Sequence, residues 1–419
     1  MRWKETKKKV LLGILMAALA AGMTGCKAKT EDKKEATAKG RYVEQEKELP
    51  AELKDSQLLW FGRDGKDLVL IDNVQQADAT GCAKYVKASG ADSFQKEEGG
   101  FVDKLSFDSS VWNLSWMKTD GGQEAVFAMF DQEDSYWGHL YTTGEDGSLT
   151  EITPAGWKEP MDYDGYAFYD TPQTVTAVGE MLAGLYQDRI EFYDPKTGEL
   201  QNTLPLSGNY LEKIAADGQD FYLFATSDMG SIKQVEHYQL GSAEPVEIIP
   251  VEDQTGTSCF VDLQEDGTLV IASEKGVLQY QKEEKQWKLL IQPQFTSFSM
   301  SSLYCLGFVT GEEDTCWALF NGEGTGYTLA QYVYDPSMPA EADKVLNVYT
   351  VNECPVIKQA AALYMKQHPD VEIRVETELS YDEMYSGSAD MNSINAALNV
   401  RILAGEGPDI LVLDDLNGT

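Results

Sequence analysis

The chain has 419 residues, 42% of them hydrophobic, and its 69 acidic residues against 34 basic ones give a formal net charge of −35 at pH 7. A chain of this length is expected to form two or three domains, each with its own core. Its negative charge would repel phosphate backbones, so nucleic acid is excluded as an expected partner. The three histidines, His139, His237 and His368, are far apart, and we expect neither a metal site nor a cofactor.

The N-terminus has the features of an export signal. Basic residues in "MRWKETKKKV" precede a 14-residue apolar run, 10–23, which is too short for a membrane span but typical of a signal peptide core. The run closes on "MTGC", which resembles the lipobox of bacterial lipoproteins, and this resemblance implies that Cys26 is lipidated. Residues 1–25 are therefore predicted to be a signal peptide and residues 26–40 a solvated tether. The expected location is the outer face of the cell membrane. Ordinary secretion with an incidental cysteine is the alternative.

Six similar units follow between residues 41 and 336. Each begins at a polar turn with a glycine, and these glycines are spaced by 57, 57, 39, 49 and 44 residues. They are Gly65, Gly122, Gly179, Gly218, Gly267 and Gly311. A tyrosine recurs later in each unit, at Tyr85, Tyr141, Tyr193, Tyr238, Tyr280 and Tyr332. Strand-like alternation and this spacing predict a mainly β fold, a β-propeller of six to eight blades, because the first two intervals have room for an extra hairpin. The tyrosines are expected to fill the layers between sheets.

No enzyme is predicted from these repeats. They contain no nucleophile motif such as G-x-S-x-G, and the acidic clusters at 131–134 and 162–164 do not complete a calcium loop. Cys305 and Cys316 flank a predicted turn, and export would permit a disulfide between them. Buried free thiols are the favoured alternative.

The pattern changes after residue 336. Residues 337–343 are predicted to be a linker, and from residue 344 strands alternate with helices. "KVLNVY" indicates a first strand, a helix follows from Pro355 until Pro369, and "VEIRVE" indicates a second strand. A second helix is predicted over Asn392–Ala404 before the apolar strand "DILVL". This region is predicted to be an α/β unit.

The sequence of this α/β unit carries a resemblance to a known family. "QHPDVEI" and "ILAGEGPDILVLD", within residues 344–416, resemble the opening of the bacterial extracellular solute-binding proteins of ABC importers, particularly those for sugars. The resemblance implies a two-lobed α/β receptor, a sugar or oligosaccharide as ligand, and ABC permease subunits as partners. It also implies that residues 344–419 are only the start of lobe one, so that the chain is expected to be C-terminally truncated.

The ligand of such a sheet is expected beyond the carboxyl ends of its parallel strands. Asn352 and Glu353 follow the first strand, and Asp414 and Asp415 follow the third, which makes these four the predicted ligand-binding residues. Exposed loop charges are the alternative interpretation of Glu353 and Asp415. Two functions remain open: a lipid-anchored receptor of an ABC importer, or a surface-anchored propeller that serves as scaffold or sensor for protein or polysaccharide.

Overall fold

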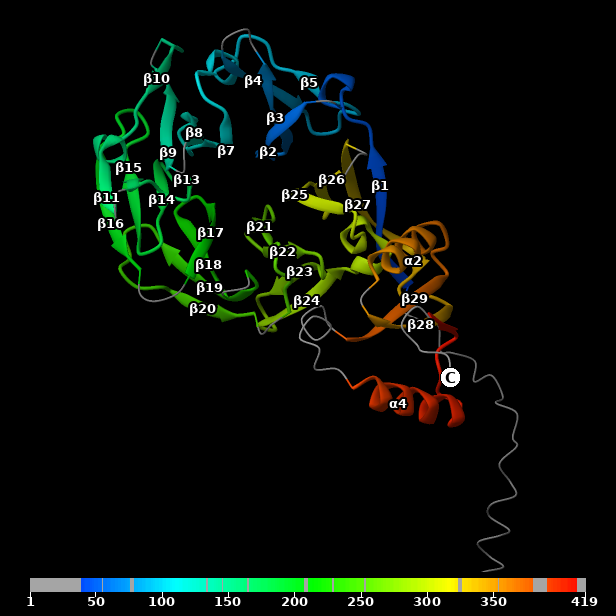
Figure 1. Cartoon of the computed structure of the whole chain (residues 1–419). Helices are drawn as coiled ribbons and strands as arrows, with labels where there is room; N and C mark the ends of the chain where they lie inside the picture. Colours follow the sequence, from blue (N-terminus) through cyan, green and yellow to red (C-terminus); the bar gives the residue numbers. More distant parts are fainter. Residues whose placement is uncertain are drawn as a thin grey trace, which may run out of the picture.

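The computed structural model describes residues 39–54, 56–75, 79–132, 135–144, 146–163, 166–206, 210–227, 230–251, 254–322, 326–352, 354–379 and 390–412. Within them, six sheets form a ring, and a smaller α/β part lies beside it (Figure 1). The described residues contain two α-helices, neither long and apolar enough to cross a membrane.

The first three blades are antiparallel sheets, with five strands in blade 1 and four in blades 2 and 3. Blade 1 consists of β2 (Gln57–Asp64), β3 (Asp67–Gln75), β4 (Thr80–Lys87) and β5 (Gln95–Lys96), with β6 (Ser106–Phe107) paired to β4. Blade 2 consists of β7 (Val111–Lys118), β8 (Glu124–Gln132), β9 (Ser135–Thr143) and β10 (Leu149–Glu151). Blade 3 consists of β13 (Thr174–Val178), β14 (Met181–Leu185), β15 (Arg189–Tyr193) and β16 (Leu200–Pro205).

The other three blades are four-stranded antiparallel sheets. Blade 4 consists of β17 (Tyr210–Asp217), β18 (Asp220–Thr226), β19 (Ile232–Gln239) and β20 (Glu247–Pro250). Blade 5 consists of β21 (Phe260–Leu263), β22 (Leu269–Ser273), β23 (Gly276–Gln281) and β24 (Gln286–Ile291). Blade 6 consists of β25 (Leu303–Thr310), β26 (Cys316–Gly322), β27 (Gly326–Pro339) and β1 (Lys39–Lys47).

The ring is closed by strands from the two ends of the repeat region. β1 pairs antiparallel with β27, with Val43 opposite Val333, so the first strand completes the last blade. The inner strands β2, β7, β13, β17, β21 and β25 contact one another in turn, and β25 contacts β2. This closure protects every inner edge, which an open sheet would leave available for pairing with another chain.

Hydrophobic clusters fill all six boundaries between blades. Trp116 and Phe130 of blade 2 pack with Ile71 of blade 1, and Trp317 of blade 6 packs with Leu70 on the opposite side of blade 1. The remaining four boundaries have equivalent clusters. Burial of apolar area on both faces of each sheet, about 25 cal/mol per Å², is therefore the main force that holds the ring together.

The recurring glycines and tyrosines occupy equivalent places in the six blades. Each glycine lies between the first and second strands, and five of them have φ values from 56° to 81°. In the Gly311 turn the left-handed conformation falls instead on Glu313 and Asp314. Each tyrosine lies in the third strand of its blade, and all but the partly buried Tyr141 are buried. The six sequence units therefore correspond to six blades.

The two long intervals contain additional elements. Between the glycines of blades 1 and 2 lie η2 (Val102–Lys104) and β6. Between those of blades 2 and 3 lie η3 (Ala155–Lys158) and the hairpin β11 (Pro160–Tyr163) and β12 (Tyr166–Tyr169). The extra length thus forms insertions rather than a seventh blade.

The α/β part contains three parallel strands and two helices. The strands are β28 (Lys344–Asn352), β29 (Val371–Leu379) and β30 (Ile410–Leu411), in the order β29-β28-β30, and the helices are α2 (Pro355–Gln367) and α4 (Met391–Leu403). Pro355 opens α2, and Asp390 caps α4 by accepting a hydrogen bond from the Asn392 amide at 3.1 Å. β27 runs to Pro339, so residues 337–339, predicted as linker, are strand because they continue its pairing with β1.

The α/β part packs against blades 5 and 6. α2 contacts η4 (Pro293–Phe295) and η5 (Ser297–Ser299), which follow blade 5. Phe295 packs there with Ala361 and Met365 of α2, and Ile373 lies on the other side of the same cluster. α2 is consequently enclosed between its own sheet and the propeller. The remaining short helix, η1 (Ala51–Leu53), precedes blade 1.

Candidate functional site

The structure places one of the five site residues predicted from the sequence. Asn352 is the last residue of β28 and is half-buried, opposite Leu379 of β29. Glu353, Asp414, Asp415 and Cys26 lie outside the described residues. Whether the four predicted ligand-binding residues lie close together therefore stays a prediction.

A different site lies between blades 2 and 3. A cavity of about 450 Å³ is enclosed by η3, the residues after β12, the β14–β15 turn, β15 and the β15–β16 turn. Its lining residues are Thr153, Pro154, Ala155, Gly156, Trp157, Asp170, Tyr186, Arg189, Glu191, Tyr193, Thr197, Gly198, Glu199 and Leu200. We call it the blade 3 cavity.

The alternation of β15 explains why its polar residues meet there. In the sequence "RIEFY", Arg189, Glu191 and Tyr193 occupy one face of the strand because successive side chains point to opposite faces. Ile190 and Phe192, on the other face, are buried in the core shared with blade 4. The polar face is covered by η3 from the insertion after blade 2, and this insertion creates the cavity.

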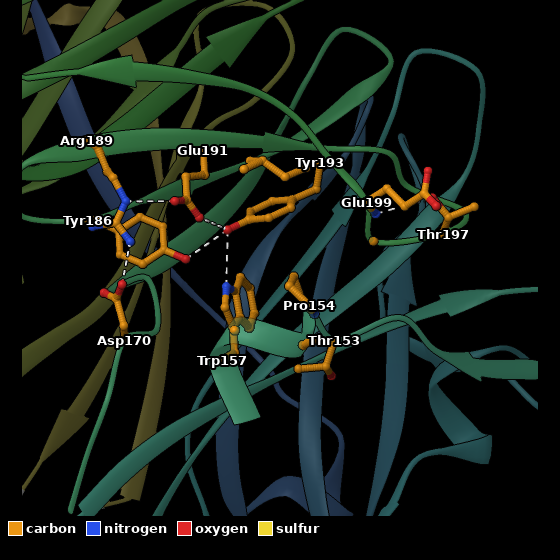
Figure 2. A pocket seen from close by; sticks show the side chains of 14 residues that line it. Thr153, Pro154, Trp157, Asp170, Tyr186, Arg189, Glu191, Tyr193, Thr197 and Glu199 are labelled. Atoms are coloured by element: carbon orange, nitrogen blue, oxygen red, sulfur yellow. Dashed lines mark hydrogen bonds and ion pairs between the residues drawn. The ribbon is translucent and has the colours of Figure 1, made fainter. Parts of the chain in front are cut away.

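The Tyr193 hydroxyl is the centre of a hydrogen-bond network (Figure 2). It donates to Glu191 and accepts from Trp157 Nε1 at 3.1 Å. The Tyr186 hydroxyl lies 2.8 Å away and must be the donor, because the single proton of Tyr193 already goes to Glu191. All three aromatic side chains are at least nine-tenths buried, so the network is held rigidly by packing.

Arg189 forms the charged side of the cavity. Its guanidinium lies 2.7 Å from both Glu191 and Asp170 and 2.9 Å from Asp188. It also stacks on Tyr186, with its central carbon 3.9 Å from the ring centre. Arg189 is thus fixed in position by three carboxylates and one ring, of which Asp170, Glu191 and Tyr186 are drawn in Figure 2.

These contacts determine the protonation states of the cavity. Burial alone would raise the pKa of Glu191, but hydrogen bonds from Tyr193 and Arg189 and the positive charge of Arg189 outweigh it, and the pKa is lowered. Burial raises the pKa of Tyr186, and the neighbouring Tyr193 and Glu191 raise it further. At neutral pH Glu191 is therefore an anion and the phenols are neutral.

The cavity combines aromatic side chains with an excess of hydrogen-bond acceptors. Asp170, Glu191 and Glu199 contribute three carboxylates against one guanidinium, so the lining favours ligands that donate hydrogen bonds and disfavours anions. The volume lies in the range of small-molecule sites, roughly 300–1,000 Å³. A general acid would need a raised carboxyl pKa, and Glu191 has the opposite.

The repeat pattern did not indicate this site, because a tyrosine that recurs in every unit, such as Tyr193, predicts a structural side chain. Two signals were present: the alternating polar residues of "RIEFY" and the 57-residue interval between Gly122 and Gly179. The cover supplied by η3, in contrast, follows from packing between segments and has no local sequence signature.

The cysteine pair and the acidic clusters are the remaining candidate sites from the sequence. Cys305 and Cys316 are free thiols, and the β25–β26 register places them opposite Phe320 and Thr310. Among the residues that the structure describes, no group of three metal-ligating side chains is found. The acidic clusters at 131–134 and 162–164 lie partly outside the described residues.

No family model and no curated protein matches the chain. It is similar to the extracellular domain assigned to a hybrid two component system of B. thetaiotaomicron, with 13% identity and a TM-score of 0.37, over 68% of this chain and 39% of that one. It is also similar to the extracellular domain assigned to a one component system of B. thetaiotaomicron, with 13% identity and a TM-score of 0.38, again over 68% of this chain and 39% of that one. The Pan2 WD40 domain of Neurospora crassa is similar with 10% identity and a TM-score of 0.37, over 65% of this chain and 74% of that domain. The chain thus spans about two fifths of the first two. No function follows from likeness at this level.

Proposed function

We propose that this chain is an exported binding protein, held at the outer face of the membrane by lipid on Cys26, whose propeller binds carbohydrate in the blade 3 cavity. The observation that carries the proposal is the lining of that cavity, where buried aromatic rings adjoin three carboxylates and one guanidinium. Binding rather than acid catalysis is proposed because Glu191 is ionised and engaged by Arg189 and Tyr193, which suits a fixed hydrogen-bond acceptor and not a general acid.

The chemistry of a neutral sugar fits this lining. Its hydroxyls donate hydrogen bonds to carboxylates, and bonds to charged acceptors are stronger than neutral ones. Its apolar C–H groups pack on exposed parts of aromatic rings. The rigid network around Tyr193 keeps the acceptors in place before the ligand arrives, which reduces the entropy lost on binding.

A second candidate function is substrate receptor of an ABC importer, with permease subunits as partners. The parallel order β29-β28-β30, with helices in both crossovers, supports it, because lobe one of such a receptor is expected to open in this way. In that case the ligand would be bound near Asn352, at the carboxyl end of β28.

Calorimetric titration of the mature chain with neutral oligosaccharides tests the first proposal. Asp170→Asn removes a partly exposed carboxylate from the lining and should weaken binding roughly tenfold, the loss of one charge-assisted hydrogen bond. Asp188→Asn is the matched control, because Asp188 also contacts Arg189 but lies outside the cavity. We expect the control to bind as the wild type does.

The same titration separates the two functions. Binding weakened about tenfold by Asp170→Asn and unchanged by Asn352→Ala supports the propeller site. Binding lost in Asn352→Ala and unchanged in Asp170→Asn supports the receptor function instead. Absence of binding to every neutral saccharide at millimolar concentration would contradict the carbohydrate proposal.

A further inference from the structure

A second cavity, of about 300 Å³, lies between blades 5 and 6, beside the chain that leads to the α/β part. We call it the blade 6 cavity. Strands β1, β23, β24 and β27 and the short helix η4 contribute to it. The lining residues are Gly40, Arg41, Tyr42, Gln279, Gln281, Lys288, Leu289, Leu290, Gln292, Phe295, Tyr334 and Ala340.

The charge of this lining is opposite to that of the whole chain. The chain has 69 acidic and 34 basic residues, yet the cavity is lined by two cations, Arg41 and Lys288, and by no carboxylate. Lys288 has a partner in Glu284, at 2.7 Å, on the exposed side of the hairpin. Arg41 differs, since no ion pair joins it to any described residue.

Arg41 is a buried cation with incomplete hydrogen bonding. The residue is only 8% exposed. Its Nη2 atom donates a hydrogen bond to the Pro369 carbonyl at 3.0 Å, and the central carbon of its guanidinium lies 3.9 Å from the centre of the Phe295 ring. Nη1 is buried and has no hydrogen-bond partner within the described part of the chain. Burial lowers the pKa of Arg41, and no neighbouring carboxylate opposes this effect.

The carboxylate that faces Arg41 in the strand register is engaged elsewhere. Asp335 lies directly opposite Arg41 in the β1–β27 ladder. Its side chain accepts hydrogen bonds from the Ser337 amide at 2.8 Å and from the Ser337 hydroxyl at 2.6 Å. The chain therefore contains a nearby anion but does not direct it to the guanidinium.

A buried charge without a partner is unfavourable, and native proteins seldom retain one without a reason. An anion in the adjacent cavity would relieve this cost, because guanidinium and ammonium groups form charge-assisted hydrogen bonds with carboxylates. Arg41 has no anionic partner among the described residues, and Lys288 is already paired with Glu284, so the two cations suit a single negative charge. The glutamine side chains supply donors and acceptors for hydroxyl groups.

We propose that the blade 6 cavity binds a small hydroxylated carboxylate, such as a hexuronic acid, with its carboxylate between Arg41 and Lys288 and its hydroxyls on Gln279, Gln281 and Gln292. This site is separate from the blade 3 cavity, whose excess of carboxylates disfavours the same ligand. Because Arg41 also holds the Pro369 carbonyl between α2 and β29, the ligand would lie at the junction of propeller and α/β part.

Calorimetric titration with glucuronate tests the proposal, with glucose as the neutral analogue of the same size and shape. The parent chain and all variants carry Asp170→Asn, so that binding of the neutral sugar in the blade 3 cavity is weakened and does not mask the comparison. We expect saturable glucuronate binding and at least tenfold weaker binding of glucose. Arg41→Gln should abolish the difference between the two ligands. Lys288→Gln, at a half-exposed position where folding is not at risk, should weaken glucuronate binding several-fold.

Lys285→Gln is the matched control for charge, because Lys285 lies in the same β23–β24 hairpin but does not line the cavity. It should bind glucuronate as the parent chain does, and circular dichroism should show that all three variants are folded. The proposal is overturned if glucuronate does not bind, if glucose binds equally well, or if Lys288→Gln and Lys285→Gln behave alike. Binding of inorganic phosphate without binding of glucuronate would also overturn it.

Discussion

The carboxylate of Glu44 on β1 lies 2.7 Å from the ammonium nitrogen of Lys366 on α2, and the Glu44 side chain is only 1% exposed. Glu44 also accepts hydrogen bonds from the amide and hydroxyl of Ser297, at 2.6 and 2.7 Å, and from the Tyr332 hydroxyl at 3.0 Å. The strand that closes the propeller is thus joined to the α/β part by a fully satisfied buried carboxylate. This contact explains how α2 is held against blades 5 and 6.

Lys366→Met should destabilise the chain by about 3 kcal/mol, because it leaves the buried Glu44 carboxylate without its cation. Chemical denaturation followed by circular dichroism measures the change. Glu44→Gln combined with Lys366→Met should recover part of the loss, since the uncompensated charge is then removed.

Lys344→Gln provides the comparison for that prediction. Its ion pair with Asp370 is exposed, and an exposed pair contributes at most about 1 kcal/mol. Equal effects of Lys344→Gln and Lys366→Met would mean that the Glu44 contact is no more important than a surface pair.

Gly198→Ala should be far more disruptive than Gly122→Ala. Both glycines have positive φ, 70° and 81°, so each substitution costs about 1–2 kcal/mol in backbone strain. At Gly198 a Cβ would also overlap the Ile152 carbonyl oxygen, whereas at Gly122 nothing lies within 4 Å. Thermal melting should show a clearly larger loss for Gly198→Ala; similar losses would show that the β15–β16 turn can move away from Ile152.

Alkaline pH should unfold the chain cooperatively. Burial raises the pKa of both Tyr186 and Tyr193 above the ordinary value of about 10. Above that pH the unfolded chain binds fewer protons than the folded one, so stability falls as pH rises; below it, the contribution is fully present. Phenolate absorbance should therefore rise together with the loss of circular dichroism. Gradual ionisation of all tyrosines in a folded chain would contradict this.

Cys26→Ala should release the protein from the membrane or leave its precursor uncleaved. The physical reason is that the apolar run 10–23 is too short to anchor the chain by itself, so retention depends on the lipid. Partition into detergent and the size of the mature chain are the measurements. Unchanged retention and processing in the variant would contradict lipidation at Cys26.

The sequence determined the local features of the fold. Turn glycines such as Gly65 and third-strand tyrosines such as Tyr332 recur because each blade needs a left-handed turn and a large buried side chain at the same place. Pro355 and Gly405, which has a φ of 77°, likewise mark where helices begin and end. Each of these signals acts within a few residues of its own position.

The tertiary structure decided what depends on pairing between distant segments. β1 is a strand because it pairs with β27, and Glu44 meets Tyr332 across 288 residues of sequence. The polar face of β15 was visible in "RIEFY", but the cavity exists only because η3 packs over it. Likewise, Arg41 and Asp335 are opposite each other in the β1–β27 ladder, yet Asp335 bonds to Ser337 and Arg41 Nη1 has no partner among the described residues. Periodicity encodes the local backbone, whereas cavities and unpaired charges depend on how separate segments pack, which no local pattern specifies.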